Sequence, residues 1–279
     1  MDMEALKAKA NQLRGDVLKI VTVAKSGHPG GALGMADLLT VLYYKYLRHD
    51  ASNPQWEERD RFVLSNGHTC PILYAILADY GYFDRDELWS FRKLGGMLQG
   101  HPSTAWNIPG VESCSGSLGN GMSVALGLAM GARQAERDSR IYCFVSDGEL
   151  QEGQPWEAAT AAAHHKVDNL CVMIDWNDCQ IDGRVHDVMD VGNLAEKFRA
   201  FGWNVHEING HDYGEIMNAY VSFLSSKGSG KPTVIAAHTL LGKGVSFMED
   251  VAKWHHGYLT DEQMEQAFAD LGLGHPTNE

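Results

Sequence analysis

Acidic residues follow an apolar run in the segment IYCFVSDGELQEG, residues 141–153. The run itself, residues 141–145, predicts a strand buried on both faces, as in the centre of a parallel sheet. The residues of interest after it are Asp147, Gly148, Glu149 and Glu152, and this stretch contains no lysine or arginine. Carboxylates gathered at the end of a strand could bind a divalent cation.

Asn177 follows the next predicted strand along the chain, residues 169–175. A right-handed crossover between parallel neighbours places both C-terminal ends at one sheet edge, where open α/β sheets bind ligands. We therefore expect Asp147 and Asn177 to converge. With the backbone carbonyl of Cys179 they would form an oxygen set suited to Mg²⁺ or Ca²⁺. The same two residues equally fit structural roles, as a helix N-cap and a turn former.

Histidines recur in similar loop settings. His28 in SGHPGG, His68 in SNGHTCP and His101 in QGHPS each follow a glycine, and His255 and His256 lie near another predicted loop. A loop histidine beside glycine has little bulk around it and can approach a ligand closely. Each one alone is an ordinary surface residue, but their recurrence in one chain indicates a binding surface.

Helix and strand patterns alternate along the chain, which predicts an α/β fold with a mostly parallel central sheet and helices on both faces. We expect strands at 61–65, 141–145, 169–175, 203–208 and 233–239. We expect helices at 4–25, 33–47, 70–79, 122–136, 154–165 and 213–226, and one in the tail, where Thr260 and Gln263 fit a capping box. The pattern loosens over 176–195. Without a repeat or linker, residues 1–279 are predicted to form a single domain.

The composition narrows the possible partners. The chain has 279 residues, 44% of them hydrophobic and 21% charged, as in an ordinary soluble domain. Its net charge of -13 argues against nucleic acid or an anionic membrane as a partner. The charged N-terminus has no apolar signal core, and no apolar run approaches the about 20 residues of a membrane span. Five cysteines without a CxxC pair indicate buried free thiols in a reducing, cytoplasmic location.

Two glycine-rich segments do not predict a nucleotide site. SKGSGKPT (226–233) lies between a predicted helix and a strand, the reverse of a phosphate-binding P-loop, and fits a turn before a strand. GSLGNG (116–121) does not follow a convincing strand, and the acidic residue of a dinucleotide fingerprint is absent about 20 positions later.

The sequence resembles transketolases over nearly the whole chain. The resemblance rests on a series of segments that occur in this order: SGHPGG, SNGHTCP, GHP, GSLGNG and SDGELQEG, followed by Asn177. The stretch from Asp147 to Asn177 resembles the thiamine-diphosphate motif of that superfamily, usually GDG with a downstream asparagine. Ser146 replaces the first glycine here, a mild departure in a backbone turn. The resemblance implies the thiamine diphosphate-binding fold in its diphosphate-binding (PP) form.

The resemblance also implies roles for individual residues. A divalent ion, Mg²⁺ or else Ca²⁺ or Mn²⁺, would be bound by Asp147, Asn177 and the carbonyl of Cys179. Thiamine diphosphate would contact His68, Gly116, Ser117, Leu118, Gly148, Glu149, Asn177 and His256. The catalytic side chains would be His28, His101, His256 and Glu152, the last at the subunit interface. His255 is the alternative to His256, because His256 precedes the motif's glycine whereas His255 follows the tryptophan.

The implied activity is transfer of a two-carbon ketol unit from a ketose or ketose phosphate to an aldose or aldose phosphate. This chain resembles only the first part of a transketolase, the diphosphate-binding domain. We therefore expect the pyrimidine-binding domain on a separate C-terminal transketolase subunit, in an α2β2 assembly with the site at an interface. The single chain should then be inactive.

Three other interpretations are open. The chain could belong to a 1-deoxyxylulose-5-phosphate synthase-like or pyruvate-handling enzyme, although the GHPGG and GHP histidines favour a ketose site. It could serve a transketolase for a modified ketose, such as a sulfonated or deoxy sugar, because the resemblance leaves phosphate recognition largely to the other half. It could also be a non-catalytic regulatory subunit, but the full set of metal-ligand and histidine candidates argues against this.

Overall fold

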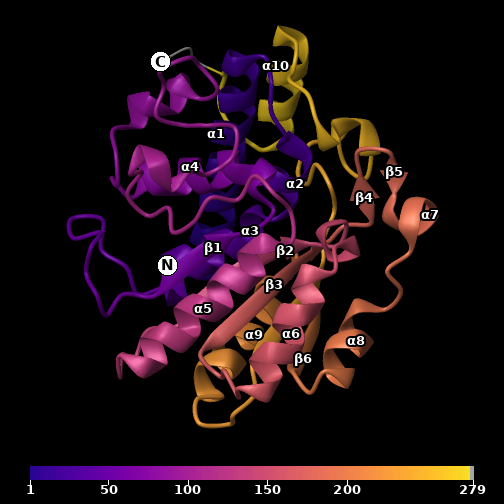
Figure 1. Ribbon diagram of the computed structural model, residues 1–279. Helices are drawn as coiled ribbons and strands as arrows, with labels where there is room; N and C mark the ends of the chain where they lie inside the picture. Colours follow the sequence, from indigo (N-terminus) through magenta and orange to yellow (C-terminus); the bar gives the residue numbers. More distant parts are fainter. Residues whose placement is uncertain (277–279) are drawn as a thin grey trace.

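A five-stranded parallel sheet forms the centre of the computed structural model, which describes residues 1–276 (Figure 1). The strand order is β1-β2-β3-β7-β6, and every neighbouring pair is parallel. The bounds are β1 (Arg61–Leu64), β2 (Ile141–Ser146), β3 (Leu170–Trp176), β6 (Asn204–Asn209) and β7 (Thr233–His238). The predicted fold class is confirmed, and each predicted strand agrees to within one residue at either end.

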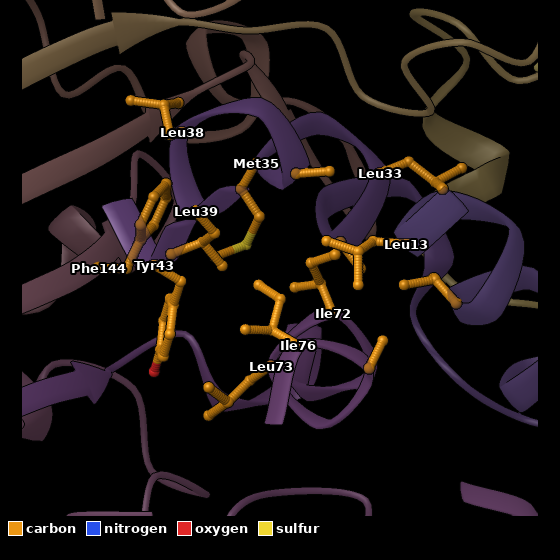
Figure 2. Close-up of a cluster of buried hydrophobic side chains, with 14 of the residues drawn as sticks. Leu13, Leu33, Met35, Leu38, Leu39, Tyr43, Ile72, Leu73, Ile76 and Phe144 are labelled. Carbon is orange, nitrogen blue, oxygen red and sulfur yellow. The ribbon is translucent and has the colours of Figure 1, made fainter. Parts of the chain in front are cut away.

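Helices cover both faces of the sheet, as predicted, and each face has its own hydrophobic core. One core includes side chains of α1 (Met3–Ala24), α2 (Pro29–Gly34), α3 (Ala36–Val41), α4 (Cys70–Asp79), α9 (Tyr213–Ser225) and α10 (Asp261–Asp270). The other includes α5 (Asn120–Gln134), α6 (Gln154–His164) and α8 (Leu194–Ala200). Figure 2 shows part of the first core, where leucines of α1 and α3 lie near Ile72, Leu73 and Ile76 of α4.

The β2 side chains alternate between these two cores because successive residues of a strand point to opposite faces. Tyr142 and Phe144 belong to the core with α1 and α4, whereas Cys143 and Val145 belong to the core with α5 and α6. All are buried, which explains the uninterrupted apolar run that leads to Asp147.

The helix predicted at 33–47 is wrong in its start and its continuity. The first helical segment, α2, begins at Pro29, and a break at Met35 separates it from α3. A π-helical turn, η1 (Leu42–Tyr46), then follows. The prediction placed the start after PGG, but proline at the first position suits a helix start. A Cβ at Gly31 would lie 2.9 Å from Thr69 Cγ2, so the glycine permits close packing there.

The segment 176–195 contains structure that its loose pattern did not reveal. A short antiparallel hairpin joins β4 (Cys179–Gln180) to β5 (Gly183–Arg184), followed by α7 (Val185–Met189). The short helix α8 was also missed, because seven residues are too few for a helical period to stand out. The predicted capping box of Thr260 and Gln263 is confirmed at the start of α10.

The five cysteines are free, and four of them are buried as expected. Cys114 is exposed, because it lies in the irregular loop before α5 and not in a strand. No helix in residues 1–276 combines the length and the hydropathy needed to cross a bilayer.

Candidate active site

The loops after β2 and β3 lie against each other at the carboxyl edge of the sheet. Ser146 pairs with Asp175 in the sheet register. The backbone N–H of Asp147 donates to the carbonyl of Asp175 at 3.1 Å. The Asp147 carboxylate in turn accepts from the backbone N–H of Asp178 at 2.5 Å. The parallel register therefore brings Asp147 beside the loop that carries Asn177, as expected.

Asp147 is a buried carboxylate without a cationic partner among the described residues. It is 1% exposed and accepts only backbone N–H groups, from Gly148 at 2.8 Å and from Asp178. Burial, with the nearby Asp175 carboxylate as the second cause, raises the pKa of Asp147 to about 8. Binding a cation would stabilise the ionised form against both effects.

Asn177 and Cys179 lie next to this carboxylate on a tight turn. The Asn177 amide accepts from the backbone N–H of Cys179 at 2.8 Å and is 7% exposed. Within residues 1–276, no three Asp, Glu, His or Cys side chains gather as a metal site. The predicted set uses one carboxylate, one amide oxygen and one backbone carbonyl, and this donor chemistry fits a hard divalent cation.

Asp175 is a second buried acid that the sequence did not single out. Its carboxylate accepts from the Thr239 hydroxyl at 2.5 Å and from the Asn177 side-chain amide at 2.9 Å. Burial raises the pKa of Asp175 to about 6. By accepting the N–H of Asn177, this carboxylate fixes the orientation of the amide. The available signal was an aspartate closing the otherwise apolar run NLCVMID.

Glu149 is fully buried and joins three segments of the chain. One carboxylate oxygen accepts from the Ser65 hydroxyl at 2.5 Å and from the backbone N–H of Gly119 at 2.7 Å. The other accepts from the backbone N–H of Ser146 at 3.3 Å. Glu149 therefore ties the loop before α5 to the ends of β1 and β2, while its contact with a cofactor stays a prediction.

Four histidine rings pack together in the same region as these acidic residues. His28 caps α2, His68 lies in the turn η2 (Gly67–Thr69), and His255 ends the turn η6 (Ala252–His255). The ring centroid of His28 lies 5.1 Å from that of His68, 5.7 Å from that of His255 and 4.8 Å from that of His256. Segments far apart in the sequence thus meet at one place.

Burial favours the neutral form of four histidines, which are His28, His68, His101 and His255. Burial, followed by repulsion from His68, lowers the pKa of His28 to about 2. Burial, followed by repulsion from His255, lowers the pKa of His68 to about 3. Burial likewise lowers the pKa of His101 and of His255. Near neutral pH each ring can therefore offer one N–H donor and one acceptor.

A cavity of about 440 Å³ is lined both by residues at the carboxyl edge of the sheet, such as Asp175 and Asn177, and by histidines. The predicted site residues on its wall are His28, His68, His101, Gly116, Leu118, Gly148, Glu149, Glu152, Asn177 and Cys179. Three predicted residues are not on the wall. Asp147 is buried beside it, whereas Ser117 and His256 are exposed. His255, the alternative to His256, lines the cavity.

Two buried polar atoms of the wall lack hydrogen-bond partners within residues 1–276. They are Oδ1 of Asn66 and Nδ1 of His255. The sequence did not single out Asn66, although it stands directly before the GH pair of SNGHTCP. Buried polar atoms are nearly always paired, so these two require water or a polar ligand in the cavity.

Comparisons with known proteins point to one family. Residues 6–278 match the family model described as transketolase, thiamine diphosphate binding domain. An apulose-4-phosphate transketolase subunit of Phocaeicola vulgatus is 39% identical over 272 residues, which cover 97% of this chain and 95% of that protein. The 6-deoxy-6-sulfo-D-fructose transketolase subunit SqwG of a Clostridium species is 39% identical over 266 residues, 95% of this chain and 96% of that protein.

Longer transketolases match over part of their length. Human transketolase is 35% identical over 272 residues, and the match covers 96% of this chain but 42% of that protein. The crystal structure of transketolase from Campylobacter jejuni superposes with a TM-score of 0.91 at 38% identity, covering 99% of this chain and 44% of that one. The chain thus spans less than half of these transketolases and nearly all of the two shorter relatives.

Proposed function

This chain belongs to the transketolase family, matching its thiamine diphosphate binding domain, and we propose that it is the N-terminal subunit of a two-chain transketolase. The observation that carries the proposal is the cavity between a buried oxygen-ligand set and a group of neutral histidines. A metal-held diphosphate and a polyhydroxylated substrate need these two kinds of surface side by side.

We propose that Asp147, Asn177 and the carbonyl of Cys179 hold a divalent ion, Mg²⁺ by preference, and that the ion holds the diphosphate of thiamine diphosphate. His68 and Gly148 would contact the diphosphate. The residues that would lie along the cofactor are Gly116, Ser117, Leu118 and Glu149. The bound cofactor supplies the means to break and form the carbon–carbon bond. The protein then has to supply position, proton donors and proton acceptors.

We propose that the histidines bind the sugar hydroxyls and move protons to and from them. His28 and His101 line the same cavity as Asn177 and Cys179, and both have a pKa lowered by burial. A neutral imidazole can donate to one hydroxyl while accepting from another. Of the adjacent pair, His255 lines the wall and is the better placed, whereas the role predicted for His256 from its following glycine is supported by its ring contact with His28.

We propose that a companion chain completes the site with a pyrimidine-binding domain, in an α2β2 assembly. Two relatives of nearly this length are named as subunits. Apolar side chains are exposed at the cavity, with Leu118 39% and Ile181 64% accessible to solvent. Exposed apolar groups at a site favour burial by a partner. Glu152 is exposed on the same wall, which suits its predicted position at the interface.

The substrate pair is a ketose donor and an aldose acceptor. The two subunit relatives are named for different ketoses, one a phosphate and one a sulfonate. The donor panel should therefore include ketose phosphates, a sulfonated ketose and a deoxy ketose. The free cysteines support a reducing, cytoplasmic location.

The test begins with purification of the chain from its native source, with identification of any protein present in near-equal amount. We expect a companion that carries a pyrimidine-binding domain. The two chains together should transfer a two-carbon unit from a ketose in the presence of thiamine diphosphate and Mg²⁺, and neither chain alone should do so. Turnover by the purified single chain would refute the two-chain arrangement. Turnover on pyruvate in place of every ketose would refute the transketolase assignment.

A further inference from the structure

Arg92 occupies an unusual backbone conformation behind the histidines. Its φ is +56°, in the left-handed region that is unfavourable for a residue other than glycine. Its backbone N–H donates to the carbonyl of Leu98 at 2.9 Å and so closes a loop after the turn η3 (Arg85–Ser90). The loop thus keeps an arginine at a position where its backbone is strained.

The guanidinium of Arg92 joins the segments that carry His28 and His101. It donates to the Ser26 hydroxyl at 2.7 Å, and its other terminal nitrogen lies 3.4 Å from Nδ1 of His28. It also lies against Gly100, where a Cβ would come within 2.6 Å of Nε of Arg92. Close approach of Arg92 therefore requires glycine at the position before His101. The Arg92 side chain thus contacts both the segment that carries His28 and the segment that carries His101.

The contact with Nδ1 determines which nitrogen of His28 carries the proton. A guanidinium has only N–H donors, so the ring nitrogen that faces it must be the unprotonated acceptor. The proton of the neutral ring is then on Nε2. Burial first, then the neighbouring histidines and the charge of Arg92 lower the pKa of His28, so the ring that faces the guanidinium is neutral.

We propose that Arg92 is a positioning residue that fixes His28 as the Nε2–H tautomer and ties the His28 segment to the His101 segment. Arg92 does not line the cavity, so it acts through the histidines and not on the substrate. The expected effect of Arg92 on turnover rests on the proposed transketolase function. The expected effect of Arg92 on the His28 tautomer does not, because it concerns this chain alone.

The tautomer can be read directly by NMR. The full chain is labelled with ¹⁵N-histidine, and long-range ¹⁵N–¹H correlations distinguish the two neutral tautomers of each ring. The His28 signals are assigned by their loss in His28→Gln. We expect the Nε2–H pattern in the wild type and in Arg92→Lys, which keeps a donor-only cation. We expect Arg92→Gln, whose side-chain oxygen can accept, to show a mixed or Nδ1–H pattern.

A matched control uses an arginine away from the cavity. Arg133, at the end of α5, donates to the carbonyls of His165 and Lys166 at 3.0 and 2.8 Å. Arg133→Gln should leave the His28 pattern unchanged. An Nδ1–H pattern in the wild type, or an unchanged pattern in a folded Arg92→Gln, would overturn the proposal. Folding is checked by the thermal midpoint, and Arg92→Lys provides the comparison if Arg92→Gln unfolds.

Turnover of the two-chain complex gives the second readout. Because small misplacements of catalytic groups can cost about 100-fold in rate, we expect a kcat about 10- to 100-fold lower in Arg92→Gln and largely restored in Arg92→Lys. A changed tautomer with unchanged kcat would overturn the positioning role. A wild-type complex without ketose turnover would refute the proposed function, while the NMR result would still decide the tautomer.

Discussion

The acidic side and the histidine side of the cavity are held in place by different kinds of structure. The acidic side consists of Asp147, Asp175 and Asn177. Asp147 directly follows β2, Asp175 lies near the end of β3, and Asn177 directly follows β3. The backbones of the two strands are paired along the sheet. The histidine side consists of residues that lie in loops and short turns, which are His28, His68, His101 and His255. A sheet register positions the first group, and contacts between loops position the second.

This difference locates the weak points of the site. The acidic side depends on a parallel ladder in the middle of a sheet buried on both faces, which tolerates little displacement. The histidine side depends on close approaches between loops, such as Gly67 against Ser115 and Gly100 against Arg92. Substitutions outside the histidines themselves should therefore disturb the histidine side more readily than the acidic side.

Removing a histidine should have the largest effect on catalysis. In the two-chain complex we expect His28→Ala to lower kcat by about 10²–10⁴-fold, the usual contribution of a proton-transferring side chain. Binding of thiamine diphosphate should change little, because His28 is not among the proposed ligands of the metal or the cofactor. Steady-state kinetics and a cofactor titration check both. His164→Ala, on the exposed end of α6, is the control. Equal activity of the two variants would contradict the role of His28.

The next largest effect should come from adding a side chain where two loops are in close contact. A Cβ at Gly67 would lie 2.0 Å from the carbonyl oxygen of Ser115, which is backbone and cannot move away cheaply. We expect Gly67→Ala to lower the free energy of unfolding by about 1–3 kcal/mol, as overpacking does, and to reduce turnover. Gly127→Ala on α5 meets nothing within 4 Å and should instead stabilise the isolated chain. Thermal unfolding of the two variants would settle the point, and equal midpoints would argue against the contact.

On the acidic side we expect a smaller effect on stability, and the direction in which it changes with pH tests the raised pKa of Asp147. Burial holds the pKa of Asp147 at about 8 in the folded chain, above its ordinary value near 4. The folded state therefore binds a proton that the unfolded state releases, so the free energy of unfolding falls as pH rises from about 4 to about 8. In the metal-free chain, Asp147→Asn should raise the thermal midpoint at pH 8, by about 2–4 °C for each kcal/mol of ionisation cost that it removes, and should have little effect near pH 4.

The control for that prediction is Glu157→Gln, on an exposed position of α6. It should leave the pH dependence of the midpoint unchanged. A midpoint that depends on pH identically in the wild type and in Asp147→Asn would contradict the raised pKa. Asp175, whose pKa is about 6, should contribute a dependence of the same sign in both proteins.

The smallest effect should come from a helix outside both sides of the cavity. Thr260 caps α10 and accepts from the backbone N–H of Gln263. We expect Thr260→Ala to lower the free energy of unfolding by about 1 kcal/mol and to leave turnover unchanged. Denaturant unfolding and a kinetic assay check this. A large loss of activity would mean that α10 supports the histidine side more directly than its contacts indicate.

The comparison also explains what could be predicted from the sequence. The approach of Asp147 to the Asn177 loop followed from two apolar runs and the rule that parallel neighbours end at one edge. The histidines were recognised from their glycine neighbours, but the reason differs from the prediction. Gly67 and Gly100 admit other protein segments, Ser115 and Arg92, and these contacts join residues distant in sequence.

Residues that act through long-range contacts escaped prediction for the same reason. Asp175 was part of an apolar strand pattern, and Arg92 was an ordinary arginine in the FRKLGG segment. The position of His255 on the wall, with His256 exposed, depends on the path of η6 and could not be chosen from the WHHG spacing.

The most direct measurement is a calorimetric titration of thiamine diphosphate into this chain with its companion. With Mg²⁺ present, we expect saturable binding by the wild type and by Glu157→Gln. We expect no saturable binding when the metal is chelated, and none by Asp147→Asn with Mg²⁺ restored. Undiminished binding by Asp147→Asn in the presence of Mg²⁺ would contradict the claim that the acidic side of the cavity holds the diphosphate through a metal.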